Sequence, residues 1–413
     1  MPDFYQHSVV STLHCLKEID LPAQEKMLAE QAEKRPISLV LPALYSEVES
    51  PALPHILKQL KGVPYIKEII FSMNRMDASQ FAHAKKFFGE SLESDQHWRI
   101  LWNDGPAVSE LYGKLAEADL THYVPGKGYN VWMAYGYVLA KGESKIIAAH
   151  DSDILSYDRE MLYRLCLPTA HSSMAYEYVK SYYARTSDRM YGRVTRLFVG
   201  PLLRAMIKVL GNHPLLVFLD NFRYPLSGEF SIDVDLADII RIPGDWGLEV
   251  GMLCEIYRSV ATRKVCQVDL GNNFEHKHQD LGFDRNQIAK DPTPTKGLMK
   301  MSHDIALNLL HNLASEGVLI GDKELKAIRL TYERLAKEVI KRHNDDSIFN
   351  GLKYYRHEEA EAVEAYFASL DSAAEIFRNR QYSSALIPNW NRVNSALPDL
   401  GEQLLEAVEQ DNA

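Results

Sequence analysis

Short apolar runs alternate with amphipathic stretches along the first third of the chain. The runs Ile37 to Leu41, Ile66 to Phe71 and Trp98 to Trp102 have the length and composition typical of buried strands. Helical spacing of apolar residues fills the intervals, over Ala52 to Leu60 and roughly Ser79 to Phe88. This βαβαβ order predicts an α/β fold with a mostly parallel, doubly wound, Rossmann-like sheet.

Later apolar runs extend the same sheet. Lys145 to Ala149 form a compact fourth run, which suits the core of a parallel sheet. Alternating aromatic residues predict a strand over Met174 to Thr186, and a turn leads into another at Phe230. A helix over Asp245 to Arg258 precedes the last predicted strand, Lys264 to Gly271.

The two ends of the chain have a different texture. Helix formers predict an N-terminal helical extension at 1–35, before the α/β domain at 36–290. An α-helical C-terminal region is expected at 291–413, in which Tyr382 to Asn394 form an irregular loop that could fold back onto a site. The predicted long helices are Lys296 to Glu316, Lys323 to Arg342, His357 to Arg378 and Gly401 to Gln410.

Composition narrows the class of protein. With 413 residues, 46% of them hydrophobic and 25% charged, the chain is typical of a soluble globular protein. A formal net charge of −10 argues against a nucleic-acid binder, which needs clustered Lys and Arg. Its four cysteines lack CxxC spacing, which favours reduced thiols. Because no leader-like or membrane-length apolar run is present, we expect a cytoplasmic protein that enters no membrane.

The fourth apolar run ends in two aspartates, Asp151 and Asp153. Carboxylates placed where a strand ends can point to one edge of an open α/β sheet, where ligands collect. They repel each other unless a cation lies near, and Mg²⁺ or Mn²⁺ holding a substrate diphosphate meets that need. The pattern alone has low specificity, because a turn with two solvated acids looks the same.

A glycine-flanked lysine, Lys127, opens the helix before this run. Gly126 and Gly128 make the loop tight and its backbone accessible, and a lysine at a helix start suits a diphosphate. The GxxxxGK[ST] pattern of a P-loop is absent. A plain loop with a solvated lysine is the competing interpretation.

Four arginines stand before a helical apolar pattern: Arg185, Arg189, Arg193 and Arg196. They could grip a phosphate or carboxylate bidentately, and spacing favours a solvated helical face equally. A second group, Glu275, His276 and His278, follows the last predicted strand and has metal-ligand character.

Seven segments recur in this order in a known family: LVLPALYSE, PGKGYN, AAHDSDI, GRVTRL, YPLSGEF, WGLEVG and QVDLGNNFEHKH. On these segments the chain resembles the glucosyl-3-phosphoglycerate synthases, with the mannosylglycerate-forming enzymes close behind. The likeness spans roughly Ile37 to Leu281, and it is the ordered set that is specific. The resemblance implies a GT-A fold, with a nucleotide-sugar half at about 36–155 and an acceptor half at about 156–290.

The activity that the resemblance implies is a retaining transfer of glucose from UDP- or GDP-glucose to 3-phospho-D-glycerate, in the synthesis of a compatible solute or a polysaccharide precursor. It implies Mg²⁺ or Mn²⁺ as cofactor and a homodimer. One alternative is mannose as the sugar, because glucose and mannose differ only in one hydroxyl's orientation. Another is D-glycerate as the acceptor.

Donor residues follow from the resemblance. Pro42 and Ala43 match the loop that holds the uracil, and Glu47 matches an acidic residue beside the base. Lys127 matches the lysine that faces the diphosphate. Asp151 matches the aspartate nearer the ribose and sugar, and is a candidate catalytic residue.

The resemblance also assigns the metal and the acceptor. Asp153 and His276 match the metal ligands. Arg193 and Thr195 match the segment that receives the acceptor's phosphate. Glu249 matches an acid near the donor sugar, where it orients the sugar or acts as a nucleophile; we favour orientation.

The chain departs from the family pattern at three places. Tyr45-Ser46 replace the usual Asn-Glu, Ser72-Met73-Asn74-Arg75 replace an acidic, glycine-rich loop, and His278 stands where an amide is common. These changes affect donor and acceptor contacts.

Two rival functions have weaker support. A metal phosphohydrolase needs its Asp-X-Asp on the first strand, whereas here it follows the fourth. An inactive glycosyltransferase-like scaffold does not need Lys127, both aspartates and His276 together.

Overall fold

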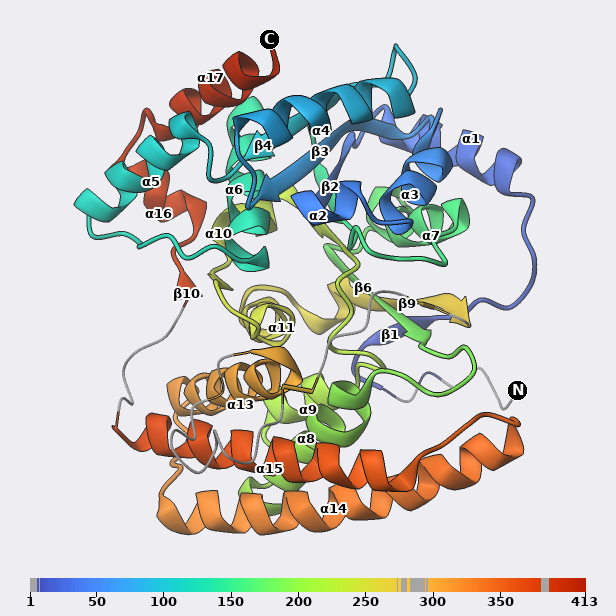
Figure 1. The fold of residues 1–413 in the computed structure, drawn as a ribbon, viewed down its shortest axis with the longest axis vertical. Helices are drawn as coiled ribbons and strands as arrows, with labels where there is room; N and C mark the ends of the chain where they lie inside the picture. The colour runs from blue at the N-terminus through green and yellow to red at the C-terminus, as the bar shows by residue number, and fades with distance from the viewer. Residues whose placement is uncertain are drawn as a thin grey trace.

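The computed structural model describes residues 6, 8–272, 274–275, 281–282, 294, 296–379 and 386–413. Within these ranges eight strands form one sheet in the order β1-β9-β6-β7-β5-β2-β3-β4 (Figure 1). All neighbours are parallel except β7, which runs antiparallel to both β5 and β6. The strands are β1 (Ser11–Leu13), β2 (Ile37–Leu44), β3 (Ile66–Asn74), β4 (Trp98–Trp102), β5 (Ile146–Ala149), β6 (Tyr178–Ala184), β7 (Phe230–Asp233) and β9 (Val265–Asn272).

The predicted α/β sheet is therefore confirmed, with one addition at the N-terminus. Residues 1–35, expected as a helical extension, contain the helix α1 (Leu21–Ala32) and also the edge strand β1, which pairs with β9. A strand of three residues has too short a pattern to be recognised in the sequence.

Helices cover both faces of the sheet because successive residues of a strand point to opposite faces. Leu39 and Leu41 of β2 enter one core, and Val40 enters the other. The first core is covered by α1, α3 (Ala52–Leu60), α4 (Ala78–Ser91) and α7 (Arg159–Ala170). The second is covered by α5 (Pro106–Glu117), α6 (Lys127–Lys141), α8 (Gly200–Leu210), α9 (Pro214–Asp220), α10 (Val234–Ile239), α11 (Leu248–Ser259) and the C-terminal helices.

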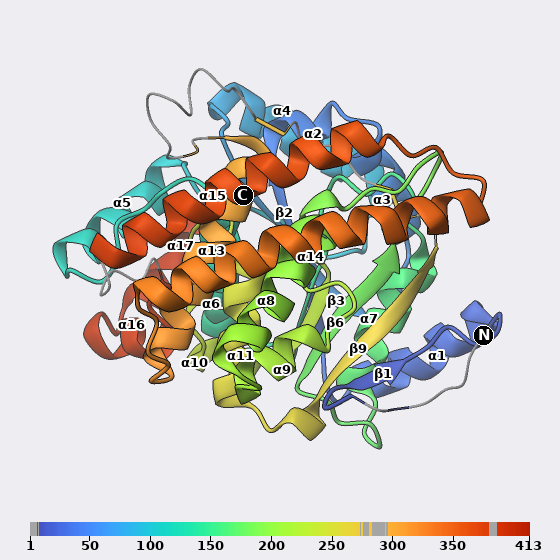
Figure 2. The same ribbon diagram turned by 90° about the horizontal axis from the view of Figure 1, so that it is seen from below.

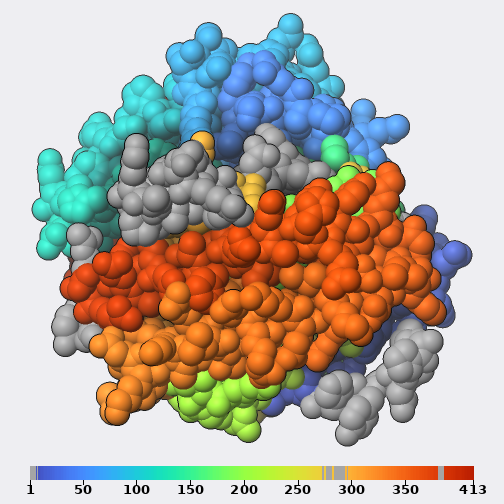
Figure 3. Space-filling view, turned by 60° about the horizontal axis from the view of Figure 1, so that its bottom comes forward, coloured from blue at the N-terminus to red at the C-terminus, as the bar shows by residue number. Residues whose placement is uncertain are grey.

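Three of the four predicted C-terminal helices are α13 (Gly297–Ser315), α14 (Asp322–Phe349) and α15 (Arg356–Asn379), and the fourth is α17 (Leu400–Asn412). The first three lie beside α8 and α9, with α14 and α15 side by side (Figures 1 and 2). Their outer surfaces make a broad face of the molecule, below the N-terminal half in Figure 3. No described helix has the combined length and apolarity that crossing a membrane requires.

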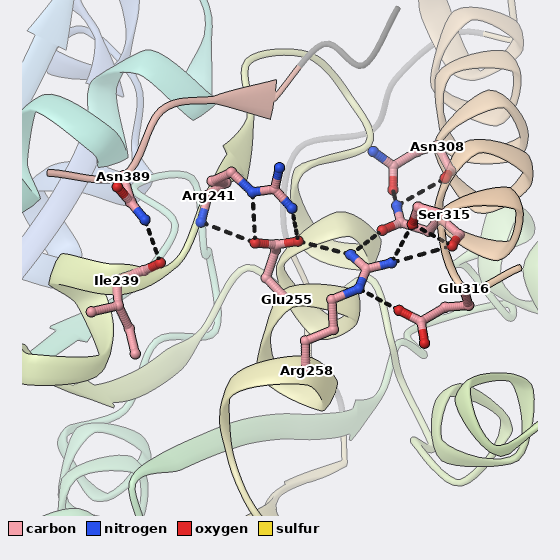
Figure 4. A network of polar contacts seen from close by, with 9 residues as sticks. Ile239, Arg241, Glu255, Arg258, Asn308, Ser315, Glu316 and Asn389 are labelled. Carbon is pink, nitrogen blue, oxygen red and sulfur yellow. Dashed lines mark hydrogen bonds and ion pairs between the residues drawn. The ribbon is translucent and has the colours of Figure 1, made fainter. Parts of the chain in front are cut away.

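A polar network joins α11 to α13 (Figure 4). The buried Glu255 carboxylate accepts hydrogen bonds from Arg241 and from Arg258, at 3.0 and 2.8 Å. Arg258 also donates to Glu316 at 2.5 Å and to the Asn312 side chain at 2.7 Å. The C-terminal helices are therefore tied to the α/β sheet by charge as well as by apolar packing.

After α15 the chain returns to the α/β sheet. The described part of the expected irregular loop contains β10 (Leu386–Ile387) and the start of α16 (Trp390–Ala396), so that expectation was wrong there. β10 pairs antiparallel with β8 (Ile242–Pro243). Then α17 (Leu400–Asn412) lies against α5 and α6, next to β4 (Figure 1).

Candidate active site

The two aspartates follow the carboxyl end of β5 in the middle of the sheet. The backbone N–H of His150 donates to the Val40 carbonyl at 3.2 Å. The Ser152 hydroxyl donates to the Pro42 carbonyl at 3.0 Å. These bonds fix the Asp-Ser-Asp turn against the end of β2, where predicted donor residues begin.

Lys127 joins this turn from the first residue of α6. Its Nζ lies 2.5 Å from Asp151 Oδ1 and 3.1 Å from Glu249 Oε1. The loop can approach so closely because Gly128 lies against the backbone of β8, where an added Cβ would stand 2.2 Å from the Pro243 carbonyl oxygen. The structure thus brings together three residues that the sequence singled out in three separate segments.

Several carboxylates lie around Lys127 at this site, and burial and their mutual repulsion raise the pKa values of two of them. Burial, Asp151 and Glu47 raise the pKa of Asp153 to about 7. Burial and Asp151 raise the pKa of Glu229 to about 7. Burial acts to lower the pKa of Lys127, but the charges of Asp151, Glu249 and Glu229 outweigh burial, and the pKa of Lys127 lies above its usual range. Such an acidic group fits a divalent cation, because a cation removes the repulsion.

The second predicted metal ligand, His276, lies outside the described residues, as does His278. Among the residues that the structure does describe, no three His, Cys, Asp or Glu side chains form a metal-binding group. The chain just before His276 is placed, however. Glu275 accepts a backbone hydrogen bond from Leu155 at 2.8 Å and donates to the Ser156 hydroxyl at 2.9 Å. The segment after β9 therefore returns to the residues that directly follow Asp153.

The predicted base-binding residues lie at the end of β2 and in the short helix α2 (Tyr45–Val48). Pro42 and Ala43 are in β2, opposite Ser72 and Met73 of β3. Glu47 is buried in α2, close enough to Asp153 for its charge to raise the pKa of Asp153.

Three residues of the site were missed in the sequence. Glu229 is fully buried, with one carboxylate oxygen accepting from the Ser181 hydroxyl at 3.2 Å. Lys180 is buried in β6 and donates to the Ser227 carbonyl at 2.6 Å; burial lowers its pKa to about 8. Gly228 lies against Asp151, so that an added Cβ would stand 2.3 Å from Asp151 Oδ2. A Gly-Glu pair before a strand, and a lysine inside one, were the available signals.

Arg193 and Thr195 lie at the start of a six-residue π-helix, η1 (Val194–Val199). Segments of π-helix often occur at functional sites. The Thr195 hydroxyl oxygen is buried and has no hydrogen-bond partner among the described residues. Arg193 instead pairs with Glu358 and Glu359 of α15, at 2.7 and 3.0 Å.

Arg185 and Tyr224 connect this segment to the aspartates. An Arg185 Nη1 atom lies 3.4 Å from the Tyr224 hydroxyl oxygen. Burial alone lowers the pKa of Arg185, but Tyr224, Tyr183 and Asp153 raise it. Gly192, with φ of +70°, packs its Cα against the same Tyr224 hydroxyl, which an added Cβ would approach to 3.1 Å. Arg193 therefore directly follows a glycine packed on Tyr224, which contacts Arg185, and Arg185 is near enough to Asp153 for the aspartate's charge to raise its pKa.

Comparison with known proteins gives clear relatives, although no family model matches the sequence. Glucosyl-3-phosphoglycerate synthase of Persephonella marina is 40% identical over 413 residues, 100% of both chains. The protein of the same name from Methanococcoides burtonii is 37% identical over 415 residues, covering 98% of this chain and 97% of that one.

Solved structures give the fold. Glucosyl-3-phosphoglycerate synthase from Mycobacterium tuberculosis, in complex with Mg²⁺ and UDP, has a TM-score of 0.53 and 22% identity, covering 76% of this chain and 89% of its own. Its complex with Mn²⁺, UDP-glucose and phosphoglyceric acid also has a TM-score of 0.53, with 21% identity over the same shares of 76% and 89%. This likeness confirms the expected GT-A fold. Taken with the full-length identity to the curated relatives, it places the chain: it belongs to the glucosyl-3-phosphoglycerate synthase family.

Proposed function

We propose that the protein is a metal-dependent retaining glucosyltransferase, which moves glucose from UDP- or GDP-glucose to 3-phospho-D-glycerate. The observation that carries this proposal is the position of Lys127 between Asp151 and Glu249, beside the acidic turn at the end of β5. A cation next to carboxylates suits a ligand that brings both a diphosphate and a metal ion. The names of the full-length relatives support the sugar and the acceptor.

For the donor, Asp153 and His276 would hold Mg²⁺ or Mn²⁺, which when bound stabilises negative charge on the diphosphate. Lys127 would exchange part of its contact with Asp151 for a diphosphate oxygen. Pro42 and Ala43 lie on the strand to which the Asp-Ser-Asp turn is bonded, and Glu47 lies in α2 directly after it, so these three residues would hold the base. Solved relatives of the same fold carry UDP with Mg²⁺ or Mn²⁺.

For the acceptor, Arg193 and Thr195 would receive the phosphate. The buried Thr195 hydroxyl finds no partner in the part of the chain that the structure describes, which supports this role, because buried polar groups normally have one. A guanidinium beside it can hold a phosphate bidentately. Holding both substrates face to face would supply much of the rate through positioning.

Retention of configuration follows from a front-face route. The leaving diphosphate takes the proton of the attacking hydroxyl, so no protein base is needed. Asp151 and Glu249 then orient the sugar, and both are held by Lys127. A covalent role of Glu249 is the alternative, and trapping of a glycosylated Glu249 by mass spectrometry would favour it.

The test is a matrix of nucleotide sugars against two acceptors. UDP-glucose, GDP-glucose and GDP-mannose are each incubated with 3-phosphoglycerate or D-glycerate and Mg²⁺, and products are identified by mass and anomeric NMR coupling. We expect glucosyl-3-phosphoglycerate with the α-anomer retained. Full activity in EDTA, or in Asp153→Ala, would exclude the metal role.

We also propose that the enzyme works in the cytoplasm as a homodimer that makes a compatible-solute precursor. Four cysteines without a disulfide support a reducing compartment. Ile348 and Phe349 at the end of α14 are 73% and 88% exposed, which supports an interface there. Light scattering on the purified protein measures the oligomeric state.

A further inference from the structure

The first turn of α15 places two glutamates on the arginines of the predicted acceptor segment. Glu359 is only 4% exposed, and its two oxygens bind different arginines: Oε1 accepts from Arg193 Nε at 3.0 Å and Oε2 from Arg196 Nη1 at 2.9 Å. Arg193 and Arg196 lower the pKa of Glu359 and outweigh its burial, which acts in the opposite direction. Glu359 is therefore a fixed anion.

Arg196, one of the two arginines bound by Glu359, is also held by the backbone. Its Nε donates to the Tyr191 carbonyl at 2.9 Å and its Nη2 to the Met190 carbonyl at 3.4 Å. It thus ties Glu359 to the loop before η1.

 Arg196 and Glu359 together form a rigid support for Arg193.

Glu358 holds Arg193 differently. Its Oε2 accepts from Arg193 Nη2 at 2.7 Å, but its side chain is 37% exposed, against 4% for Glu359. Removing an exposed carboxylate from an arginine costs little, because water replaces it, whereas removing a buried one leaves a charge unpaired. Of the two glutamates, Glu358 is therefore the one that an incoming anion can displace.

The geometry of the guanidinium supports this division. Arginine has five N–H donors, and Glu359 and Glu358 take one each, through Nε and Nη2. When Glu358 leaves, the Nη1 and Nη2 groups are available together, which is the arrangement that binds a phosphate bidentately. The Nε contact to Glu359 meanwhile keeps the guanidinium plane in place.

We propose that α15 is part of the acceptor site: Glu359 positions Arg193, and Glu358 occupies its outer edge until a phosphorylated acceptor displaces it. This inference rests on the proposed function, in which Arg193 receives the acceptor's phosphate. Glu359 is a positioning residue, and Glu358 competes with the acceptor. The two neighbours in sequence therefore act on acceptor affinity in opposite directions.

The test compares Glu358→Gln with Glu359→Gln in steady-state kinetics with 3-phosphoglycerate. We expect Glu358→Gln to lower the KM for the acceptor about threefold, since one competing charge is lost. We expect Glu359→Gln to raise that KM about tenfold or more, since Arg193 loses its support. The KM for the nucleotide sugar should stay unchanged in both. Glu361→Gln, an exposed glutamate on the same helix, is the matched control.

Two further measurements keep the roles separate from folding and from general anion binding. In an Arg193→Gln background, Glu358→Gln should no longer change the KM. Inorganic phosphate should inhibit Glu358→Gln competitively, and more strongly than it inhibits the wild type. Sulfate should bind this variant less tightly than 3-phosphoglycerate does. Thermal melts verify that each variant is folded. If Glu359→Gln does not fold, the acceptor KM of Glu358→Gln alone decides the test.

The inference is overturned if Glu358→Gln raises the acceptor KM or leaves it unchanged while the wild type is active. A wild type that transfers no sugar to 3-phosphoglycerate contradicts the proposed function instead, so the two failures are distinguishable.

Discussion

The indole rings of Trp132 and Trp390 stack with their centroids 4.5 Å apart, although the residues lie 258 positions apart in the chain. Trp390 donates to the Trp132 carbonyl at 2.7 Å, and Trp132 donates to the Pro388 carbonyl at 2.7 Å. Gly136 makes room for Trp390, because an added Cβ would stand 2.0 Å from the ring. This contact holds the returning C-terminal segment on α6, the helix that Lys127 begins.

Trp390→Ala should lower the free energy of unfolding by about 3–5 kcal/mol, the usual cost of removing a fully buried tryptophan. Trp390→Phe keeps most of the apolar contact and loses one hydrogen bond, so its cost should be smaller, about 2 kcal/mol. Urea denaturation measures both. A loss below about 1 kcal/mol in Trp390→Ala would show that the segment does not stabilise the fold.

Gly228→Ala should impair catalysis without unfolding the protein. The new methyl group would collide with Asp151, which must move away from Lys127. We expect kcat to fall about 100-fold, because a displacement of about 1 Å at a reacting group has that effect. Gly113→Ala in α5 is the control, since an added Cβ there meets nothing within 4 Å. Equal activity of the two variants would contradict the placement of Asp151.

Divalent cations should stabilise the protein more at high pH than at low pH. The pKa of Asp153 is raised to about 7 from its ordinary 3.8. Between these values the folded protein holds a proton that the unfolded chain releases, so this contribution to stability falls as pH rises through that window. A metal ion needs the deprotonated carboxylate, and its binding therefore competes with the proton.

The measurement is the Mn²⁺-induced rise in Tm at about pH 5.5 and about pH 8. We expect the larger rise at the higher pH, and loss of the difference in Asp153→Asn. Asp95→Asn, which changes an exposed aspartate, should behave like the wild type. A rise that is independent of pH would contradict a metal at Asp153.

Glu255→Ala should destabilise the junction between α11 and α13. Arg258 would lose its buried partner and keep Glu316 and Asn312. We expect a loss of about 3 kcal/mol, the lower end for a broken buried pair, because Arg241 is half exposed. Glu338→Ala, which breaks an exposed pair with Arg334 on α14, should cost below about 1 kcal/mol. Chemical denaturation compares the two.

The central strands could be predicted from the sequence, because buried parallel strands consist of short apolar runs. Lys145 to Ala149 was expected, and β5 spans Ile146–Ala149. The antiparallel insertion of β7 between β5 and β6 was not foreseen, since strand order depends on packing between distant segments. Apolar periodicity reports which face is buried and not which strand is adjacent.

The candidate site divides in the same way. Lys127, Asp151 and Glu249 were singled out, and the structure brings them together. Glu229 and Lys180 were missed because a charged residue just before or inside a strand gives no sign that its charge will be buried. The pairing of Arg193 with Glu358 joins residues 165 positions apart, which no local pattern can indicate.

The contact of Asn412 with Ile100 matters for the way the protein is made. The Asn412 amide donates to the Ile100 carbonyl at 2.8 Å and accepts from its N–H at 3.0 Å, so one side chain replaces a neighbouring strand at the edge of the sheet. This cover is synthesised 312 residues after the strand that it protects. Until then the nascent chain carries an open sheet edge, the kind of surface that recruits strands from other copies. Completion of α17 is therefore the step that ends the chain's exposure to aggregation at β4.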